Sequence, residues 1–205
     1  MPQRIRNTFR LPEGDALPGW LAARLADPTP RQMPLENDAA SAVLVPVLAR
    51  PGDATLLLVR KARHLKKHAG QVGFPGGRVD AGDATCDAAA LREAREEVGL
   101  DPAQVRVLGQ LDDERTYVTD FHIRPVVGWV ADPPARFAWD GGELDGVLEI
   151  GLRELVDERP ASWVEFALFG QVWRMPRYEF SGGRVVWGAT ARILRNLQDR
   201  LRGGS

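Results

Sequence analysis

Residues 74–100 read FPGGRVDAGDATCDAAALREAREEVGL, and this stretch decides how the rest of the chain is interpreted. A proline–glycine turn opens it, and Gly99 ends a charged run over 85–98 that has the pattern of a helix. Glu93, Glu96 and Glu97 lie within one turn of that helix. Like charges at this spacing repel and destabilise an isolated helix, so we expect a positive partner among them.

The composition narrows the class of protein. The chain has 205 residues, of which 44% are hydrophobic and 27% charged, as in an ordinary globular domain. Its 27 basic and 28 acidic side chains nearly balance, which argues against a general nucleic-acid or membrane binder. Cys86 is the single cysteine, so an internal disulfide is excluded and a reducing compartment is indicated. Without a secretory signal or an apolar run of membrane-spanning length, we expect a cytoplasmic protein.

Strand-like segments outnumber helical ones along the chain. A turn of sequence PGD separates two apolar runs over 39–50 and 54–62, which predicts a β-hairpin. Further strands are expected at 104–111, 121–130, 146–150, 163–180 and 183–187, and helices at 14–27, 85–98, 151–155 and 188–202. Because strands and helices do not alternate regularly, the order favours an α+β fold with a mixed β-sheet sandwiched between helices. Prolines at 133 and 134 and glycines at 141 and 142 predict a mobile loop.

The helix over 85–98 divides into two faces. At about 100° per residue, Glu93, Glu96 and Glu97 fall on one face. Leu91, Ala94 and Val98 fall on the opposite, apolar face. The carboxylates therefore point away from the core, toward solvent or a cleft. A solvated surface with arginine partners is one interpretation. The other is a site for Mg²⁺, a hard cation that prefers oxygen ligands, and the glycine turn favours it because glycine lets a ligand approach the backbone closely.

The stretch GGRVDAGDATCDAAALREAREEVGL resembles the signature of the Nudix hydrolases. Matching positions are Gly77, Arg92, Glu93, Glu96, Glu97, Gly99 and Leu100. Asp83 stands where the signature has glutamate, with one extra residue before Arg92, and Ala94 replaces a bulkier aliphatic residue. The resemblance implies a Nudix-type mixed sheet between helices, with the signature helix after a glycine-rich turn and a helix at the C-terminal end.

The residues before the signature resemble the motif of the coenzyme A pyrophosphatase branch of that family. The shared positions, at the spacing of the motif, are Leu56, Leu57, Arg60, Ala62, Gly70, Phe74, Pro75, Gly76 and Gly77. Three positions depart from the motif: Leu58 replaces a threonine, Lys61 replaces a serine and Lys66 replaces an arginine. The resemblance extends over about residues 40–200, which predicts one Nudix hydrolase domain at 40–202 after an N-terminal extension, 1–39, that carries a short helix.

A cationic run, RKARHLKKH at 60–68, lies between these two motifs. A solvated basic loop and a nucleic-acid patch are the plainer interpretations. Coenzyme A carries a diphosphate and a ribose 3′-phosphate, so a compact cluster of positive charge also suits it. Arg60 and Lys66 are the candidate substrate-binding residues, because arginine grips phosphate bidentately and lysine binds it as a point charge.

The resemblance implies metal-dependent hydrolysis of a diphosphate. Mg²⁺ or Mn²⁺ would be held by Glu93, Glu96, Glu97 and the carbonyl of Gly76, with Arg92 orienting Glu93. The catalytic residues would then be Arg92, Glu93 and Glu97, and the general base is either Glu97 or a loop acid such as Glu143. Coenzyme A is the expected substrate, with ADP-ribose, NADH or a nucleoside triphosphate as alternatives. A non-catalytic binding module is a further alternative, and a homodimer is compatible with the sequence.

Overall fold

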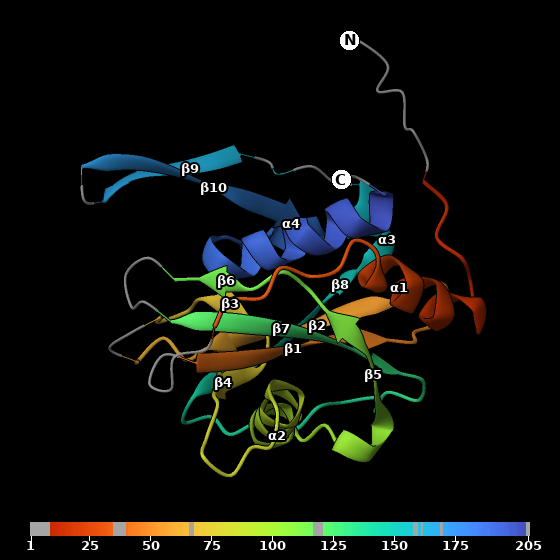
Figure 1. Ribbon diagram of the computed structural model, residues 1–205. Helices are drawn as coiled ribbons and strands as arrows, with labels where there is room; N and C mark the ends of the chain where they lie inside the picture. Colours follow the sequence, from red (N-terminus) through yellow and green to blue (C-terminus); the bar gives the residue numbers. More distant parts are fainter. Residues whose placement is uncertain are drawn as a thin grey trace.

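The computed structural model describes residues 9–34, 40–65, 68–116, 121–157, 160, 162–168 and 170–203. At its centre lies one sheet with the strand order β3–β2–β1–β7–β5 (Figure 1). Three short or peripheral strands extend it, since β4 pairs with β1, β6 with β7, and β8 with β2. The strands are β1 (Ala40–Leu48), β2 (Thr55–Lys61), β3 (Val72–Gly73), β4 (Gly76–Arg78), β5 (Val105–Gln110), β6 (Glu114–Arg115), β7 (His122–Val130) and β8 (Leu144–Gly151).

The sheet is mixed, as the sequence predicts. β1 and β2 form the predicted hairpin, in which Val47 pairs with Leu56. On its other side β1 runs parallel to β7, from Ala40 opposite His122 to Leu48 opposite Val130. The other strand pairs of this sheet are antiparallel.

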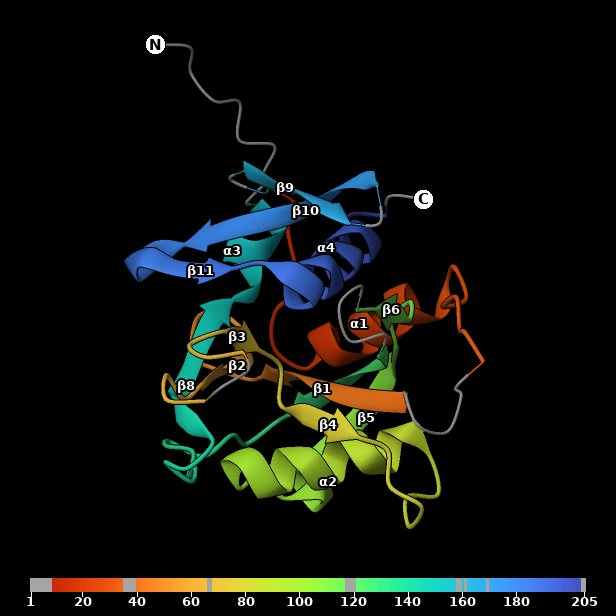
Figure 2. The same cartoon turned by 90° about the vertical axis from the view of Figure 1, so that its left-hand side faces the viewer.

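Helices cover both faces of the sheet (Figures 1 and 2). The helix α2 (Cys86–Val98) lies on one face, and α4 (Gly188–Arg202) lies on the other with α1 (Ala16–Ala26) and the short α3 (Leu152–Asp157). Two 3₁₀ turns, Pro102–Gln104 and Ser181–Gly183, complete the helical elements of the described residues. No helix in this part of the chain is long and apolar enough to cross a membrane.

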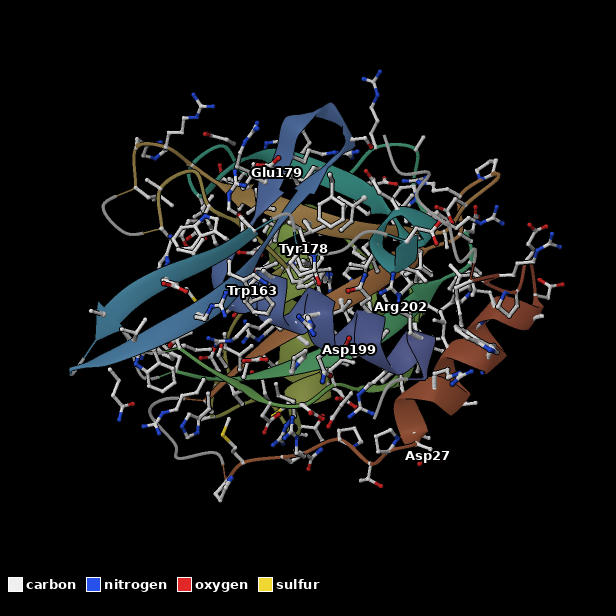
Figure 3. All side chains as sticks on the ribbon, turned by 90° about the horizontal axis from the view of Figure 1, so that it is seen from above. Asp27, Trp163, Tyr178, Glu179, Asp199 and Arg202 are labelled. Atoms are coloured by element: carbon white, nitrogen blue, oxygen red, sulfur yellow. The ribbon has the colours of Figure 1, made fainter. Side chains whose placement is uncertain are left out.

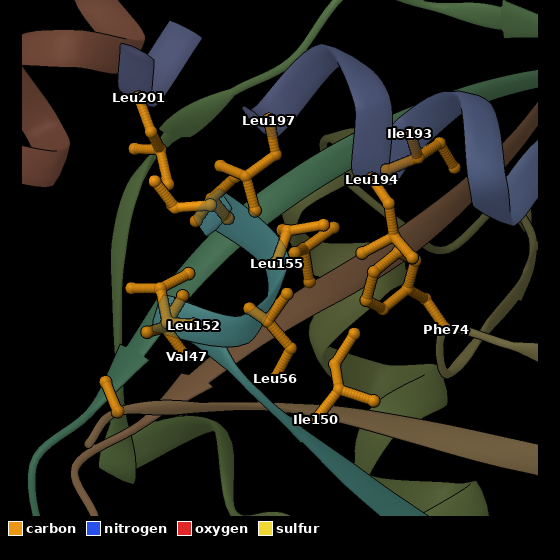
Figure 4. Packing of buried hydrophobic residues seen from close by; sticks show 14 of the residues in the cluster. Val47, Leu56, Phe74, Ile150, Leu152, Leu155, Ile193, Leu194, Leu197 and Leu201 are labelled. Carbon is orange, nitrogen blue, oxygen red and sulfur yellow. The ribbon is translucent and has the colours of Figure 1, made fainter. Parts of the chain in front are cut away.

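Successive residues of β2 pack alternately into two separate hydrophobic cores, one on each face of the sheet. Leu57 and Val59 are fully buried under α2, and Leu56 and Leu58 are buried on the opposite face. This period of two is what a strand covered on both sides requires. Figure 4 shows the second core, in which the leucines of α3 and α4 pack onto the sheet.

The helix α1 contributes Leu17, Leu21 and Leu25 to that second core. A buried guanidinium fastens its C-terminal end, because Arg200 of α4 donates to the carbonyl of Leu25 at 3.1 Å and to Asp112 Oδ1 at 2.6 Å. The described part of the predicted extension thus packs with the sheet, while the boundary between residues 39 and 40 stays a prediction.

A three-stranded sheet lies above α4, formed by β9 (Ser162–Leu168), β10 (Gln171–Phe180) and β11 (Arg184–Val186) (Figures 2 and 3). Tyr178 anchors it to α4 by donating a hydrogen bond to Gln198 Oε1 at 3.1 Å, and burial raises the pKa of Tyr178 to about 12. Trp163, which is labelled beside α4 in Figure 3, lies under the guanidinium of Arg195 at 5.4 Å.

Candidate active site

The glycine turn sits directly between β1 and α2. Its strand β4 pairs with β1, so that Gly76 lies opposite Val43 and Gly77 opposite Ala42. A methyl group on Gly76 would come within 2.6 Å of the Cα of Val43, and one on Gly77 would collide with the Glu93 carboxylate. Neither glycine is needed for an unusual backbone angle. Both are needed because the chain passes too close to its neighbours for a side chain.

The boundaries of α2 follow from local sequence signals. Thr85 precedes the helix in an extended conformation, and its hydroxyl accepts a hydrogen bond from the backbone N–H of Ala88 at 3.1 Å. Gly99 ends the helix in the left-handed conformation, with φ of 68°, and its N–H returns to the carbonyl of Arg95. These two ends fix the direction in which the three glutamates of the helix project.

Arg92 is the positive partner that the carboxylates require. Its guanidinium binds Asp83 bidentately, at 3.1 and 3.0 Å, and contacts Glu93 Oε1 at 3.0 Å and Glu96 Oε2 at 3.1 Å. A further hydrogen bond runs to the carbonyl of Arg78. Arg92 thus connects the turn, the loop before the helix and the helix itself, and it holds Glu93 in one orientation.

Asp83 therefore has a defined place despite the extra residue in its spacing. Its side chain is only 7% exposed, and the Arg92 hydrogen bonds hold its pKa below the ordinary value. Glu93 shows the opposite shift. Burial raises its pKa, and the repulsion of Glu97 and Glu96 acts in the same direction, while Arg92 partly compensates. The pKa values of two carboxylates that share one arginine are thus shifted in opposite directions.

A cavity of about 280 Å³ lies beside the carboxylate face of α2. Its lining is almost wholly acidic and consists of Glu93, Glu96, Glu97, Asp140, Glu143 and Leu144. The last three belong to the connection between β7 and β8, at 131–143, and to the start of β8. The structure therefore brings Glu143, one of the two candidate bases, to the same cavity as the helix glutamates. Whether this connection is mobile stays a prediction.

Glu97 differs from the expectation for its face, because it is largely buried. The residue is 9% exposed and sits between α2, β2 and the glycine turn. Its Oε1 atom accepts from Lys61 Nζ at 2.6 Å, and its Oε2 atom accepts from the backbone N–H of Gly76 at 3.1 Å. A helical wheel assigns Glu97 to the polar face correctly, but it cannot show that neighbouring elements cover that face.

The two candidate substrate-binding residues have different outcomes. Arg60 is an exposed residue of β2, and its guanidinium lies near Gly146 of β8 rather than in the lining of the acidic cavity. Lys66 lies outside the described residues. Sequence reasoning missed Lys61, although it shares a strand face with Leu57 and Val59 and so points toward α2. It also missed Asp140, for which no sequence signal is visible.

A metal ion would have to reorganise this site. Among the described residues, no three acidic, histidine or cysteine side chains are gathered closely enough to hold a metal ion as they stand. The oxygens of Glu93 and Glu97 are instead turned toward Arg92, Lys61 and Gly76. The chemistry of the donors nevertheless fits a hard divalent cation, because five carboxylates line one cavity and carboxylate oxygen is the ligand that such cations prefer.

A larger cavity, of about 330 Å³, lies near α1 and the β1–β2 turn and offers less chemistry. Most of its charged groups are paired, since Arg50 binds Glu149 at 2.7 Å and Arg153 lies 3.7 Å from Asp53 and 2.6 Å from Glu13. The acidic cavity at α2 is therefore the candidate active site.

A protein-family model described as NUDIX domain matches residues 38–178. The chain belongs to the Nudix family. It is 42% identical over 166 residues to proteins named "Uncharacterized Nudix hydrolase NudL" from Salmonella paratyphi B and Salmonella newport, a match that covers 78% of this chain and 82% of each relative. The family match and these hydrolase relatives identify the chain as a Nudix hydrolase, and such enzymes generally need divalent metal ions and act on small nucleotides.

A solved structure agrees with the fold. A MutT/nudix family protein from Enterococcus faecalis superposes with a TM-score of 0.52 at 14% identity, over 93% of this chain and 70% of that one. This likeness confirms the predicted arrangement of a mixed sheet between helices.

Proposed function

We propose that this Nudix hydrolase cleaves the diphosphate of coenzyme A, giving 4′-phosphopantetheine and adenosine 3′,5′-bisphosphate. The observation that carries the metal-dependent part is the acidic cavity, in which the signature glutamates of α2 meet Asp140 and Glu143. Glu93, Glu96, Glu97 and the carbonyl of Gly76 are the ligands we assign to Mg²⁺ or Mn²⁺. A divalent ion there would neutralise the diphosphate and lower the pKa of the attacking water.

The protein's own groups supply orientation and a proton acceptor. Arg92 fixes Glu93 through its 3.0 Å contact, so the carboxylate is already directed before substrate binds. Glu143 and Glu97 remain the candidates for the base that takes the proton of the attacking water. Glu97 has both oxygens engaged, by Lys61 and Gly76. Replacing Glu143 with glutamine therefore tests the simpler assignment first.

The choice of coenzyme A rests on the motif before the signature and on where the cationic run begins. Lys61 contacts Glu97 at the cavity, and the N–H of Ala62 donates to the carbonyl of Glu143 at 2.8 Å. The run at 60–68 therefore starts at the wall of the acidic cavity. A substrate whose diphosphate occupies the cavity can present a further phosphate to that run, as coenzyme A does with its ribose 3′-phosphate.

A phosphate-release panel tests this function. Purified protein with Mg²⁺ or Mn²⁺ is incubated with coenzyme A, ADP-ribose, NADH and GTP, and Glu93→Gln serves as the inactive control. Coenzyme A should have the highest kcat/KM. A preference for ADP-ribose, NADH or GTP would overturn the substrate and leave the hydrolase in place. Binding without turnover in wild type would instead favour a non-catalytic module.

A second comparison tests whether the cationic run at 60–68 binds the ribose 3′-phosphate. Coenzyme A should be cleaved better than its 3′-dephospho form, and replacing Lys66 and Lys67 with alanine should reduce that preference by roughly 10- to 100-fold. Activity on the dephospho form should stay nearly unchanged. The measurement is kcat/KM at fixed ionic strength, because salt screens exposed charges. An equal preference in both proteins would show that these lysines do not bind the phosphate.

A further inference from the structure

Lys61 places an ammonium group inside a cluster of carboxylates. Its Nζ lies 2.6 Å from Glu97 Oε1, and the two side chains are 29% and 7% exposed. The contact is thus more shielded than an ordinary surface ion pair, in which both partners are solvated. It joins β2 to α2, two elements that are far apart in sequence.

Backbone hydrogen bonds fix the position of Lys61 in β2, which limits the directions that its side chain can take. The N–H of Lys61 donates to the carbonyl of Gln71 at 2.9 Å, and its own carbonyl accepts from Gly70 at 3.0 Å. On the opposite edge Lys61 pairs with Leu144 of β8, after a shift in register between Arg60 and Lys61. Leu144 lines the acidic cavity. Because β2 keeps its alternation through this shift, Lys61 leaves the strand on the same face as Leu57 and Val59, toward α2.

The ammonium occupies the side of Glu97 that a metal ion would need. One oxygen of Glu97 is taken by the backbone N–H of Gly76, so the oxygen that faces Lys61 is the one left for a cation. Glu93 and Glu96 add negative charge next to it, and Lys61 offsets part of their repulsion in the absence of metal. A divalent ion binding to this oxygen must compete with Lys61.

We propose that Lys61 is a positioning residue that holds Glu97 ready in the metal-free protein, is displaced when a divalent ion binds, and then faces the substrate's diphosphate. The inference rests on the proposed metal-dependent function. A lysine suits this exchange, because its compact charge sits on a flexible four-carbon stem and can move from a carboxylate to a phosphate oxygen. Metal binding and phosphate binding are then coupled through one side chain.

The decisive test measures Mn²⁺ binding to the substrate-free protein, by calorimetry or by the electron paramagnetic resonance of free Mn²⁺. Lys61→Met removes the competing ammonium, so Mn²⁺ should bind about tenfold more tightly than to wild type. Lys61→Gln keeps a hydrogen-bond donor without the charge and should show the same gain. It also guards against a folding defect that is peculiar to methionine.

The matched control is Arg106→Met, which makes the same change in net charge at an exposed residue of β5 that does not line the cavity. Its Mn²⁺ affinity should equal that of wild type within about twofold, since exposed charges at a distance are screened. An unchanged or weaker Mn²⁺ affinity in both Lys61 variants would overturn the inference. A gain of the same size in Arg106→Met would do so too, because general electrostatics would then explain it.

A kinetic measurement tests the second half of the proposal. At saturating Mn²⁺, Lys61→Met should raise KM for the preferred substrate of the panel about tenfold or more, and Lys61→Arg should restore it, because arginine can also bind phosphate. An unchanged KM would refute the move toward phosphate. Turnover by wild type in the same preparation separates the two proposals. If wild type is active and the Lys61 variants have its Mn²⁺ affinity and KM, only the proposed role of Lys61 is refuted. If wild type neither turns over substrate nor binds Mn²⁺, the proposed function is refuted as well.

Discussion

Replacing Arg92 with methionine should destabilise the protein, because four acidic side chains contact that guanidinium: Asp80, Asp83, Glu93 and Glu96. Asp83 and Glu93 are only 7% and 17% exposed, so each would lose a charge-assisted contact in a shielded place. Breaking a buried pair by removing one partner costs about 3–5 kcal/mol, whereas the exposed contact with Glu96 contributes about 0–1 kcal/mol. Because Arg92 itself is 28% exposed, we expect the lower end, about 3 kcal/mol.

The assay is urea unfolding of wild type and Arg92→Met at a series of pH values. In thermal unfolding, the same loss of about 3 kcal/mol corresponds to a fall in Tm of roughly 6–12 °C for a chain of this length. The pKa of Asp83 is lowered in the folded protein, so its pairing stabilises the fold above the unfolded pKa of about 3.9 and stops doing so as pH falls through the folded pKa. The gap between the two proteins should therefore narrow below about pH 4.

Arg95→Met is the matched control, since Arg95 is an exposed residue of the same helix. It should alter the free energy of unfolding by no more than about 0.5 kcal/mol. If both variants were equally destabilised, or if the gap for Arg92→Met did not change between pH 7 and pH 3, the assignment of Arg92 as the electrostatic centre of this site would be refuted.

Three further predictions concern the site and the core. Glu93→Gln should keep the fold and lower turnover by orders of magnitude at saturating Mg²⁺; near-wild-type turnover would remove Glu93 from the catalytic residues. Gly76→Ala should lower the free energy of unfolding in urea by about 1–3 kcal/mol or more, since the new methyl would meet backbone atoms. Gly77→Ala should lower it less, because its methyl would meet the Glu93 side chain, but it should weaken Mn²⁺ binding by displacing that carboxylate. Equal effects of the two variants on stability would contradict this. Arg200→Met should cost about 3 kcal/mol, read as a lower Tm in calorimetry, because Asp112 loses a buried partner; a change below about 1 kcal/mol would argue against it.

The elements that the sequence predicts well are those whose signals are local. Thr85 and Gly99 mark both ends of α2, and the PGD turn fixes the β1–β2 hairpin. On α4 the spacing of Ala191, Leu194, Leu197 and Leu201 predicts the buried face, and all four are fully buried. Such signals depend on residues within a few positions of each other, so no knowledge of the tertiary structure is needed.

The features that escaped prediction depend on contacts between distant segments. The sequence marks 60–68 as cationic but cannot show that the packing of α2 on the sheet brings Glu97 within 2.6 Å of Lys61. Asp140 reaches the cavity only through the path of the connection between β7 and β8. The roles of Arg60 and Lys66 toward substrate stay predictions, as do the metal ligands.

The parallel pairing of β1 with β7 has a consequence for how the site comes into existence. Both the glycine turn and α2 lie in the chain segment between these two strands, and α2 packs on the face that the strands build together. Closing so long a loop costs conformational entropy before any native contact repays it, and folds of high contact order form slowly for that reason. The stretch 74–100, although continuous in sequence, therefore gains its geometry only after a long-range event. An excised peptide of the same sequence would carry the carboxylates but would lack the strands that position them.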